Sequence, residues 1–397
     1  HPDNTRLFVQ TMSRDQRELD AFYVNRKSGK MLKKIFTEKD SAWVNINDDL
    51  YFLENGTFIW QSERDGFAHL YRFKDSGELV NQITKGKWAL RSSGGPFWLR
   101  QSVQAINEKI GKIYFTAMKE SSVERHLYSV DLAGKNIEKI SKEKGVHSIG
   151  CSPNGEYYFD KFSDSSTPPM LSLHSISGEV VKIIDKPKLS LIIDMELQTP
   201  ELFTIPTSDG FPMPAQILKP ADFDETKEYP LIYHVYGGPS APTVFDSWQG
   251  SSLLYDNILL RNGYLVVRFD HRSATAISKT LENRVHLMIS GPIEMEDIVD
   301  GIRWLKSKDF VDPKRVGIWG WSGGGSFTLN AMTNTPEFKA GISGAPVTDW
   351  HYYDTKWGEF AMKRPQDNPE GYEKTSFVKS AKNLKGRLLL IHGTYDD

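Results

Sequence analysis

Four glycine turns divide the first half of the chain into units of similar length. Each turn joins a small residue to a glycine and is flanked by short stretches in which apolar and polar residues alternate. Alternation of this kind around a tight turn is typical of a β-hairpin. The glycines are 48, 57 and 44 residues apart and stand at Gly29, Gly77, Gly134 and Gly178. A period of this length limits the first half to a repeated β-sheet unit.

Other positions follow the same period. A tyrosine stands six residues before each of the first three glycines, and an isoleucine stands six residues after all four. A β-rich run precedes each hairpin, at residues 7–9, 58–60, 113–115 and 157–159. Four-stranded units that recur about every 40 to 50 residues predict a β-propeller, with four blades present in this sequence. A plain β-sandwich is the alternative. Because the sequence opens on His1 rather than Met, we expect the ring of blades to continue upstream.

The pattern changes around Lys186 and Pro187, where the hairpins end and strand-like segments begin to alternate with helical ones. We place the domain boundary within residues 187–195, with a propeller domain over 1–190 and a second domain over 191–397. Such alternation predicts a mostly parallel α/β sheet, whose catalytic loops follow the carboxyl ends of its strands. The predicted strands are residues 231–236, 264–269, 316–319, 340–343 and 388–391, and the clearest helix is residues 293–307.

The third of these strands leads into a G-x-S-x-G pattern, Gly-Trp-Ser-Gly-Gly at residues 320–324, and a helix-compatible run follows over 326–332. In α/β-hydrolases a sharp strand-to-helix turn with small neighbours raises the serine hydroxyl above the sheet. Ser322 is therefore the candidate nucleophile, and the backbone N–H of Gly323 is the first candidate donor to an oxyanion. The alternative is a glycine-rich turn whose serine has no catalytic role.

A serine nucleophile needs a histidine base and an acid that orients this base, and in α/β-hydrolases they follow in the order Ser, Asp or Glu, His. The strand at 388–391 is followed by two carboxylates, Asp396 and Asp397, which spacing alone does not separate. No histidine follows them, and His351 and His392 both precede the acid. We therefore expect the base beyond residue 397, and we expect these 397 residues alone to be inactive because a triad acts as a unit.

Two more segments follow predicted strands. Tyr236 precedes Gly-Gly-Pro at 237–239, so its hydroxyl is a second candidate oxyanion donor, with an ordinary turn as the alternative. Residues 345–357 carry a dense group of aromatic side chains. These side chains either line an apolar pocket or form a core beneath a long loop.

Composition excludes several classes of function. The chain carries 49 Lys and Arg against 51 Asp and Glu, so it has no basic excess with which to bind nucleic acid. Its single cysteine, Cys151, excludes an intramolecular disulfide and a multi-cysteine metal site. We predict no cofactor and no metal. No apolar run approaches the length of a transmembrane helix.

Together, these segments resemble the prolyl oligopeptidase family of serine peptidases, and most closely its dipeptidyl peptidase IV branch. The resemblance covers nearly the whole chain. In the first half it rests on Trp60–Phe67 and on His69–Tyr71. In the second half it rests on Tyr-Pro-Leu at 229–231, Val-Tyr-Gly-Gly-Pro at 235–239, residues 310–316, Gly-Trp-Ser at 320–322, Ala-Pro-Val at 345–347 with Trp350, Tyr352, Tyr353 and Asp354, Leu-Ile-His-Gly-Thr at 390–394, and Asp-Asp at 396–397.

The resemblance implies a propeller followed by an α/β-hydrolase domain, with Ser322 as nucleophile, Asp396 as triad acid and Tyr236 as side-chain oxyanion donor. It also implies peptide substrates and a homodimer in the full-length form. Members of the family are secreted, periplasmic, membrane-anchored or cytosolic, so the resemblance does not determine the compartment, although we favour a periplasmic or secreted location over a cytoplasmic one. The pocket for the residue before the cleaved bond, usually Pro or Ala, would be lined by Trp321, Val347, Trp350, Tyr353 and Trp357.

The sequence departs from the family in three places. The paired glutamates that hold the substrate N-terminus in the family are expected upstream of residue 1, so the release of dipeptides is inferred from the remaining motifs. Gly323 stands where the best-known members have Tyr. Residues 270–274 read Asp-His-Arg-Ser-Ala, where the family has Asp, a small or amide residue, Arg and Gly. We interpret this last difference as variation in a structural loop away from the catalytic groups.

The leading hypothesis is a serine peptidase that releases N-terminal dipeptides with Pro or Ala in the second position through an acyl-enzyme. Two alternatives within the family are a prolyl endopeptidase and an acylaminoacyl peptidase. The alternative from another class is a propeller on an inactive hydrolase that binds peptides without cutting them.

Overall fold

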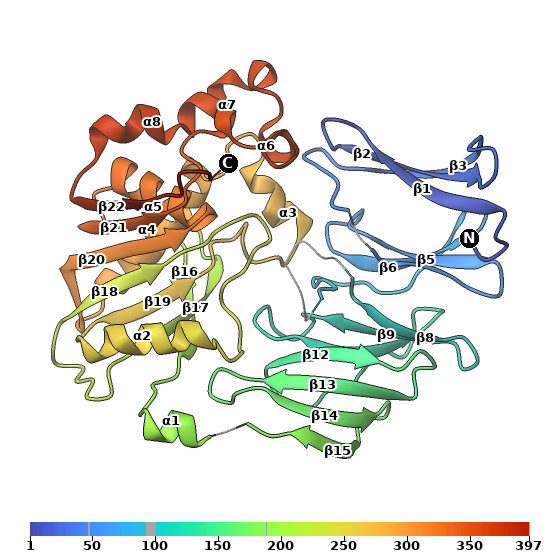
Figure 1. Ribbon diagram of the computed structural model, residues 1–397, viewed down its shortest axis with the longest axis horizontal. Coiled ribbons are helices and arrows are strands. Elements are labelled where there is room, and N and C mark those ends of the chain that lie inside the picture. The colour runs from blue at the N-terminus through green and yellow to red at the C-terminus, as the bar shows by residue number, and fades with distance from the viewer. Residues whose placement is uncertain (47, 93–100, 188, 397) are drawn as a thin grey trace. The chain divides into compact units, whose positions relative to one another are not determined.

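The computed structural model describes residues 1–46, 48–92, 101–187 and 189–396. The chain divides into two compact units (Figure 1). The first comprises His1–Phe162, Met170–Lys186 and Ile277–Thr280, and the second comprises Ser163–Pro169, Pro187–Ala276 and Leu281–Asp397. No helix in the described part of the chain is both long enough and apolar enough to cross a bilayer.

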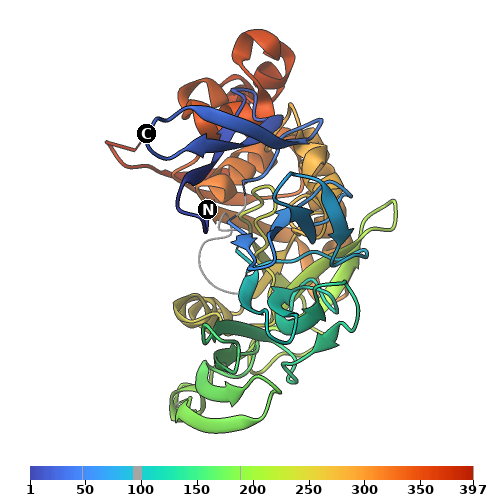
Figure 2. The same cartoon turned by 90° about the vertical axis from the view of Figure 1, so that its right-hand side faces the viewer.

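The first unit contains antiparallel sheets that follow one another in chain order, as Figures 1 and 2 show from two directions. The first sheet has three strands in the described residues, β1 (Arg6–Met12), β2 (Glu18–Asn25) and β3 (Met31–Lys39). The other sheets have four strands each: β4 (Leu50–Phe52), β5 (Thr57–Ser62), β6 (His69–Lys74) and β7 (Leu79–Gln82); β8 (Val103–Asn107), β9 (Lys112–Ala117), β10 (His126–Asp131) and β11 (Glu138–Lys139); and β12 (Val146–Cys151), β13 (Tyr157–Ser163), β14 (Met170–Ser175) and β15 (Val180–Asp185).

The inner strands of the β4–β7 sheet, β5 and β6, are buried on both faces. On β5, Phe58 and Trp60 pack into one core with Tyr71 of β6, whereas Ile59 packs into a second core with Leu70. Alternate side chains of a strand point to opposite faces, so this sheet separates two cores. Face-to-face stacking of successive sheets is the arrangement of propeller blades, and it differs from a two-sheet sandwich, in which each sheet has one outer face.

The repeated glycines and isoleucines of the sequence contact each other between sheets. Gly77 has a positive φ of 86°, and a Cβ atom built on it would lie 2.2 Å from the carbonyl oxygen of Ile35, on the preceding sheet. The same close approach recurs between Gly134 and Ile83, at 2.8 Å, and between Gly178 and Ile140, at 2.9 Å. Only glycine fits where a turn adopts this conformation and meets another backbone. The sequence period therefore records the packing of one sheet against the next.

A second repeated contact joins the third strand of a sheet to the segment after its hairpin. The Oγ1 of Thr84 accepts a hydrogen bond from the backbone N–H of Leu70 and lies 3.0 Å from Nδ1 of the buried His69. In the next sheet, the Oγ of Ser141 accepts from Leu127 N and lies 3.0 Å from Nδ1 of His126. Both sheets thus satisfy a buried histidine and a backbone donor with one hydroxyl.

The second unit contains a seven-stranded sheet in the described residues, in the order β16-β17-β19-β18-β20-β21-β22. The five strands from β19 to β22 in this order are parallel, as the sequence predicted, and β16 and β17 add an antiparallel pair that it did not predict. The strands are β16 (Glu201–Pro206), β17 (Pro212–Leu218), β18 (Tyr229–His234), β19 (Leu265–Phe269), β20 (Val311–Trp321), β21 (Ala340–Gly344) and β22 (Arg387–Ile391).

Helices cover both faces of this sheet (Figure 1). Leu253 and Leu260 of α2 (Ser251–Arg261) pack on Val266, whereas α4 (Pro292–Lys306) and α5 (Gly323–Asn334) pack with Val267 on the opposite face. The remaining helices are short: α1 (Ser190–Asp194), α3 (Lys279–Glu282), α6 (Thr355–Met362), α7 (Pro369–Lys374) and α8 (Phe377–Ser380).

Candidate active site

The carboxyl ends of the parallel strands bring the predicted site segments to one edge of the sheet. Strand β18 leads to Tyr236, its neighbour β20 leads to Ser322, and β22 leads to Asp396. The aromatic segment 345–357 follows β21, and residues 270–274 follow β19. Loops at this edge form the active sites of open parallel sheets.

Ser322 occupies a strained turn between β20 and α5. Its φ of 56° and ψ of −119° are unfavourable for a residue with a side chain, and its backbone N–H donates to the carbonyl of Gly344 over 2.9 Å. The turn packs tightly on the end of β18, since Cβ atoms built on Gly320 and Gly324 would lie 2.4 and 2.1 Å from the carbonyl oxygen of Val235. The glycines of the G-x-S-x-G pattern are therefore required by this contact, and Ser322 stands immediately before α5, whose N-terminus favours negative charge.

The two predicted oxyanion donors lie next to each other. A Cβ atom built on Gly323 would lie 3.9 Å from both Cε2 and Cζ of Tyr236, so the phenol end of this tyrosine is beside the Gly323 backbone. Burial raises the pKa of Tyr236, and the nearby Tyr353 raises it further. The hydroxyl therefore keeps its proton at neutral pH and is able to donate it to a hydrogen bond.

Asp396 lies on the loop after β22 with an exposed side chain. Its Oδ2 is 3.5 Å from Nδ1 of His392, and its backbone N–H donates to the carbonyl of Gly393 over 3.4 Å. The Nε2 of His392 is 3.4 Å from the carbonyl oxygen of Pro346. Asp397 lies outside the described residues.

The other histidine considered from the sequence is engaged by its own segment. The Nδ1 of His351 is 2.6 Å from Oδ1 of Asp349, and its ring lies 4.6 Å from that of Tyr372. Asp349 also accepts a hydrogen bond from Ser376 Oγ over 2.6 Å. These contacts stabilise the loop after β21.

Two of the predicted pocket residues contact each other and a third is held near the nucleophile turn. The ring of Tyr353 meets that of Trp350 edge-on, with centroids 5.8 Å apart. Trp350 is itself buried, and its indole N–H donates to the carbonyl of Ile289 over 3.2 Å, so it is part of the core as well. The backbone N–H and carbonyl of Val347 both bond to the Oγ of Ser326 in α5, each over 3.0 Å.

The remaining two predicted pocket residues have separate surroundings. The ring of Trp321 covers Gly344, where a built Cβ atom would lie 2.2 Å from Cε3, and the side chain is 55% exposed. Trp357 packs on Phe360 of its own helix, α6, with ring centroids 4.9 Å apart.

The loop after β19 contacts the segment that carries Tyr236, so the expectation that residues 270–274 lie away from the candidate catalytic groups was wrong. The Nε2 of the buried His271 is 2.9 Å from the carbonyl oxygen of Gly237. Asp270 accepts hydrogen bonds from the backbone N–H groups of Thr243 and Val244, and burial raises the pKa of Asp270 to about 6. Only the place of residues 270–274 in the fold could have indicated this contact, because they follow β19, a strand that neighbours β18.

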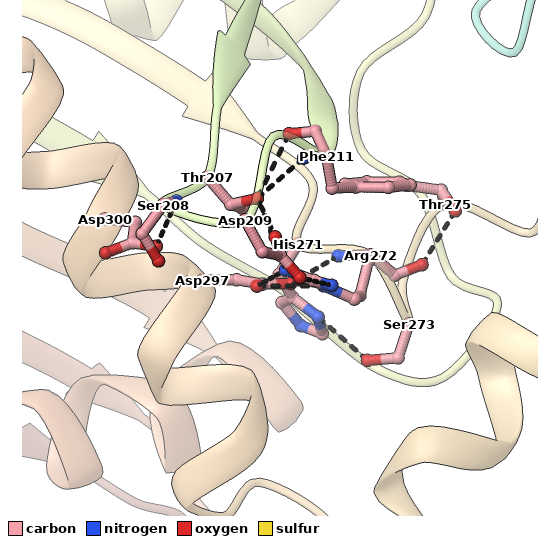
Figure 3. Close-up of polar contacts among 10 residues, drawn as sticks. All are labelled: Thr207, Ser208, Asp209, Phe211, His271, Arg272, Ser273, Thr275, Asp297 and Asp300. Atoms are coloured by element: carbon pink, nitrogen blue, oxygen red, sulfur yellow. Dashed lines mark hydrogen bonds and ion pairs between the residues drawn. The ribbon is translucent and has the colours of Figure 1, made fainter.

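Arg272 ties this loop to two other segments, and Figure 3 shows its guanidinium group between two carboxylates. Its Nε and Nη2 donate to Asp297 of α4 over distances of 2.7 to 3.0 Å, and its Nη1 and Nη2 donate to Asp209 over 2.8 Å. The guanidinium holds the pKa of Asp209 well below its usual range, and the carboxylates raise that of Arg272. Paired charges of this kind stay ionised at neutral pH.

One cluster in the first unit has the residue types of a metal site. Ligand atoms of Glu120, Glu124 and His126 all lie within 4.8 Å of one another. Each is already engaged, because Glu120 bonds to Lys139 over 2.7 Å and His126 bonds to Glu124 over 2.6 Å. The cluster is therefore accounted for by a Lys–Glu ion pair and a hydrogen bond between Glu124 and His126, whose pKa burial lowers.

Two family models match the chain. The model of the dipeptidyl peptidase IV N-terminal region matches residues 1–169, and that of the prolyl oligopeptidase family matches residues 252–397. Dipeptidyl peptidase 8 from Mus musculus is 30% identical over 405 residues, which cover 91% of this chain and 44% of that protein. A protein of Arthroderma gypseum named probable dipeptidyl-aminopeptidase B is also 30% identical, over 99% of this chain and 44% of its own length.

The structure is similar to the crystal structure of Porphyromonas gingivalis dipeptidyl peptidase 4, with a TM-score of 0.89 and 28% sequence identity. The similarity covers 98% of this chain and 54% of that chain. The chain thus spans about half the length of the relatives it matches. These matches confirm the predicted combination of propeller and α/β-hydrolase folds. The chain belongs to the prolyl oligopeptidase family, in its dipeptidyl peptidase IV branch.

Proposed function

We propose that this chain forms part of a serine peptidase that releases dipeptides from the N-termini of peptides with Pro or Ala in the second position. The observation that carries the proposal is the strained Ser322 beside two oxyanion donors, Gly323 and Tyr236. The names of the relatives, which are dipeptidyl peptidases and a dipeptidyl-aminopeptidase, favour this activity over others of the family.

In this proposal the Oγ of Ser322 attacks the carbonyl carbon of the peptide bond, and a histidine base oriented by Asp396 takes the hydroxyl proton. The carbonyl oxygen becomes an oxyanion that receives hydrogen bonds from the Gly323 N–H and the Tyr236 O–H. The tetrahedral intermediate collapses, the base gives its proton to the leaving amine, and the acyl-enzyme remains. Water then attacks the ester, which releases the dipeptide and restores Ser322.

The substrate pocket in this proposal begins at Tyr353 and Trp350. The nearby Tyr353 raises the pKa of Tyr236, which supports the proposal that the aromatic segment after β21 lines the same site as the oxyanion donors. A proline ring is compact and apolar, and aromatic walls suit it. Val347, Trp321 and Trp357 complete the proposed lining.

The proposed partner in the full-length protein is a second copy of the chain. Analytical ultracentrifugation of the intact protein tests this dimer.

The test compares two chromogenic amides of Gly-Pro on the intact protein, one with a free and one with a blocked N-terminus. We expect the free amide to be cleaved and the blocked amide to be spared, with Ser322→Ala as the inactive control. Equal cleavage of both would indicate a prolyl endopeptidase or an acylaminoacyl peptidase. Failure of a fluorophosphonate probe to label Ser322 would refute the proposal that the protein is a serine peptidase. The alternative of a protein that binds peptides without cutting them would then remain.

A further inference from the structure

Two loops at the candidate active site are joined at three points. One loop, residues 237–244, directly follows Tyr236, and we call it the tyrosine loop. The other, residues 270–275, follows β19, and we call it the brace loop. Their strands, β18 and β19, are parallel neighbours in the sheet, so the loops leave the same edge side by side.

The first joint is between His271 and Gly237. The carbonyl of Gly237 accepts only, so the hydrogen bond of 2.9 Å requires a proton on Nε2 of His271. The other ring nitrogen, Nδ1, then accepts from the Oγ of Ser273, 2.9 Å away. Complete burial lowers the pKa of His271 to about 4, so the ring keeps this neutral form at physiological pH.

Gly237 itself is closely surrounded. Its φ is 81°, and a Cβ atom built on it would lie 2.5 Å from the ring of Phe327 and 2.9 Å from Nε2 of His271. Gly237, the residue after Tyr236, therefore packs closely against both the Phe327 ring of α5 and the imidazole of His271. This packing restricts rotation of the backbone beside the tyrosine.

The second and third joints lie further along the tyrosine loop. The backbone N–H of Ser240 donates to the carbonyl of Ser273 over 2.8 Å. The carboxylate of Asp270 accepts from the backbone N–H and the hydroxyl of Thr243 over 2.8 and 2.7 Å, and from the backbone N–H of Val244 over 3.0 Å. The brace loop thus contacts the beginning, middle and end of the tyrosine loop.

The brace loop is fixed in turn by Arg272. This guanidinium group bonds to Asp297 of α4 and to Asp209 on the turn between β16 and β17, and Figure 3 shows the two carboxylates around it. The buried Thr275 also donates through its hydroxyl to the carbonyl of Arg272 over 2.8 Å. Anchors on two separate elements make the brace loop a firm support.

We propose that His271 is a positioning residue for the oxyanion donor Tyr236. Its Nε2–H fixes the carbonyl of Gly237, and this bond sets the direction in which the tyrosine hydroxyl points toward the reacting carbonyl oxygen. A donor that is held before the reaction stabilises the transition state without a cost of reorganisation. The proposal rests on the proposed peptidase function of the same site.

The test measures kcat and KM of the intact protein on a Gly-Pro amide for His271→Leu and His271→Gln. Leucine keeps much of the volume and removes the donor, whereas glutamine carries an N–H₂ group at a similar reach. We expect His271→Leu to lower kcat about 10- to 100-fold with KM nearly unchanged, since loss of an oxyanion donor costs about 100- to 1000-fold. We expect His271→Gln to retain most of the activity. Equal loss in both variants would overturn the proposal.

A double substitution tests whether His271 acts through Tyr236. In a Tyr236→Phe background the hydroxyl is gone, so His271→Leu is expected to lower kcat by less than about twofold. Losses that multiply would show that His271 acts independently of Tyr236 and would overturn the proposal. Where His271→Leu fails to fold, Ser273→Ala removes the partner of Nδ1, and its smaller loss of kcat is expected to vanish in the same background.

His174 in the first unit provides a matched control. It is also a buried histidine bonded to a serine Oγ, 2.8 Å away on Ser172, and to a glycine carbonyl, 3.4 Å away on Gly178. We expect His174→Leu to lower stability and to leave kcat unchanged, and an equal loss of kcat would overturn the specific role of His271.

Absence of both fluorophosphonate labelling and peptidase activity in the wild type would refute the proposed function and this proposal together. Multiplying losses in an active, labelled enzyme would refute this proposal alone.

Discussion

In both units glycines allow two backbone segments to pack closely, but the sequence pattern of these glycines differs between the units. In the first unit Gly77 approaches the carbonyl of Ile35, and equivalent pairs recur in the next two sheets. In the second unit Gly324 approaches the carbonyl of Val235, and this contact belongs to a single turn. A packing contact that is repeated along the chain appears as a period, whereas a contact made once appears only as a motif or not at all.

This difference separates stability from chemistry. The repeated contacts of the first unit pack successive sheets against each other, so we expect each to contribute to folding. The single contacts of the second unit place Ser322, Tyr236 and the brace loop at one edge of a sheet. We therefore expect substitutions in the first unit to act on stability and those in the second to act mainly on rate.

The largest expected effect is that of Ser322→Ala on hydrolysis. Removal of the nucleophile of a triad lowers kcat by about 10⁴- to 10⁶-fold, because the acyl-enzyme no longer forms and only substrate binding and the oxyanion donors still accelerate hydrolysis. The measurement is the rate on a Gly-Pro amide by the intact protein, with the melting temperature as control for folding. A variant that retains more than about one per cent of the activity would contradict Ser322 as nucleophile.

The next largest effect is expected from Gly77→Ala, on stability. The new Cβ atom would lie 2.2 Å from the Ile35 carbonyl oxygen, and the residue would keep an unfavourable φ of 86°. Conformational strain of about 1–2 kcal/mol and steric strain of about 1–3 kcal/mol together predict a loss of about 2–5 kcal/mol in the free energy of unfolding. Urea unfolding followed by tryptophan fluorescence measures this loss.

Gly29 provides the matched control for that substitution. It has a similar φ of 68°, and a Cβ atom built on it meets nothing within 4 Å. Gly29→Ala is therefore expected to cost only the conformational strain of about 1–2 kcal/mol. Equal losses at the two positions would show that the contact with Ile35 does not contribute to the packing of the sheets.

The sequence predicted the elements whose patterns are strong. The hairpins, the five parallel strands and the helix near residues 293–307 all lie within a few residues of their predicted positions. The antiparallel pair β16 and β17 was missed, because β17 contains Pro212 and Pro214 and proline disfavours a strand assignment. Here the neighbouring strands and the buried Met213 override the local preference.

The candidate site was predictable where a residue type and a turn occur together. Ser322 and Gly323 follow from a G-x-S-x-G pattern between a strand and a helix. The contact of His271 with Gly237 was not predictable, because it joins two loops that are distant in the sequence and involves no repeated pattern. Trp350 illustrates a third case, since its aromatic segment suggested either a pocket or a core and the side chain is in fact buried with its N–H bonded.

A smaller effect is expected from the pH dependence of stability at Asp270. Burial raises the pKa of this carboxyl from 3.8 to about 6, so the folded state binds the proton more tightly than the unfolded state. Protonation of Asp270 therefore stabilises the folded state. This contribution to the free energy of unfolding is fully present below about pH 4 and is lost as the pH rises through about 6. A shift of about two units corresponds to about 3 kcal/mol.

The corresponding test compares the wild type with Asp270→Asn by urea unfolding from pH 4 to pH 7. We expect the wild type to lose stability relative to the variant over this interval, because asparagine does not titrate. A constant difference between the two proteins across the interval would contradict a raised pKa for Asp270.

The smallest expected effects are those of Thr84→Val and Ser141→Ala, which test whether the repeated sheets of the first unit are energetically equivalent. Each substitution removes the hydroxyl that accepts from a backbone N–H and contacts a buried histidine, His69 in one sheet and His126 in the next. A buried donor left without a partner costs about 1–3 kcal/mol.

Because the two hydroxyls make the same pair of contacts, we expect losses in the free energy of unfolding that agree within about 0.5 kcal/mol, with kcat unchanged in both variants. One difference separates the sites, since Nε2 of His126 also bonds to Glu124, whereas Nε2 of His69 bonds to the carbonyl of Gly86. A larger loss in the free energy of unfolding for Ser141→Ala would therefore indicate that His126, because it bonds to Glu124, depends more on the Ser141 hydroxyl than His69 depends on that of Thr84. Equal losses would show that the repeat in the sequence is a repeat in energy as well as in geometry.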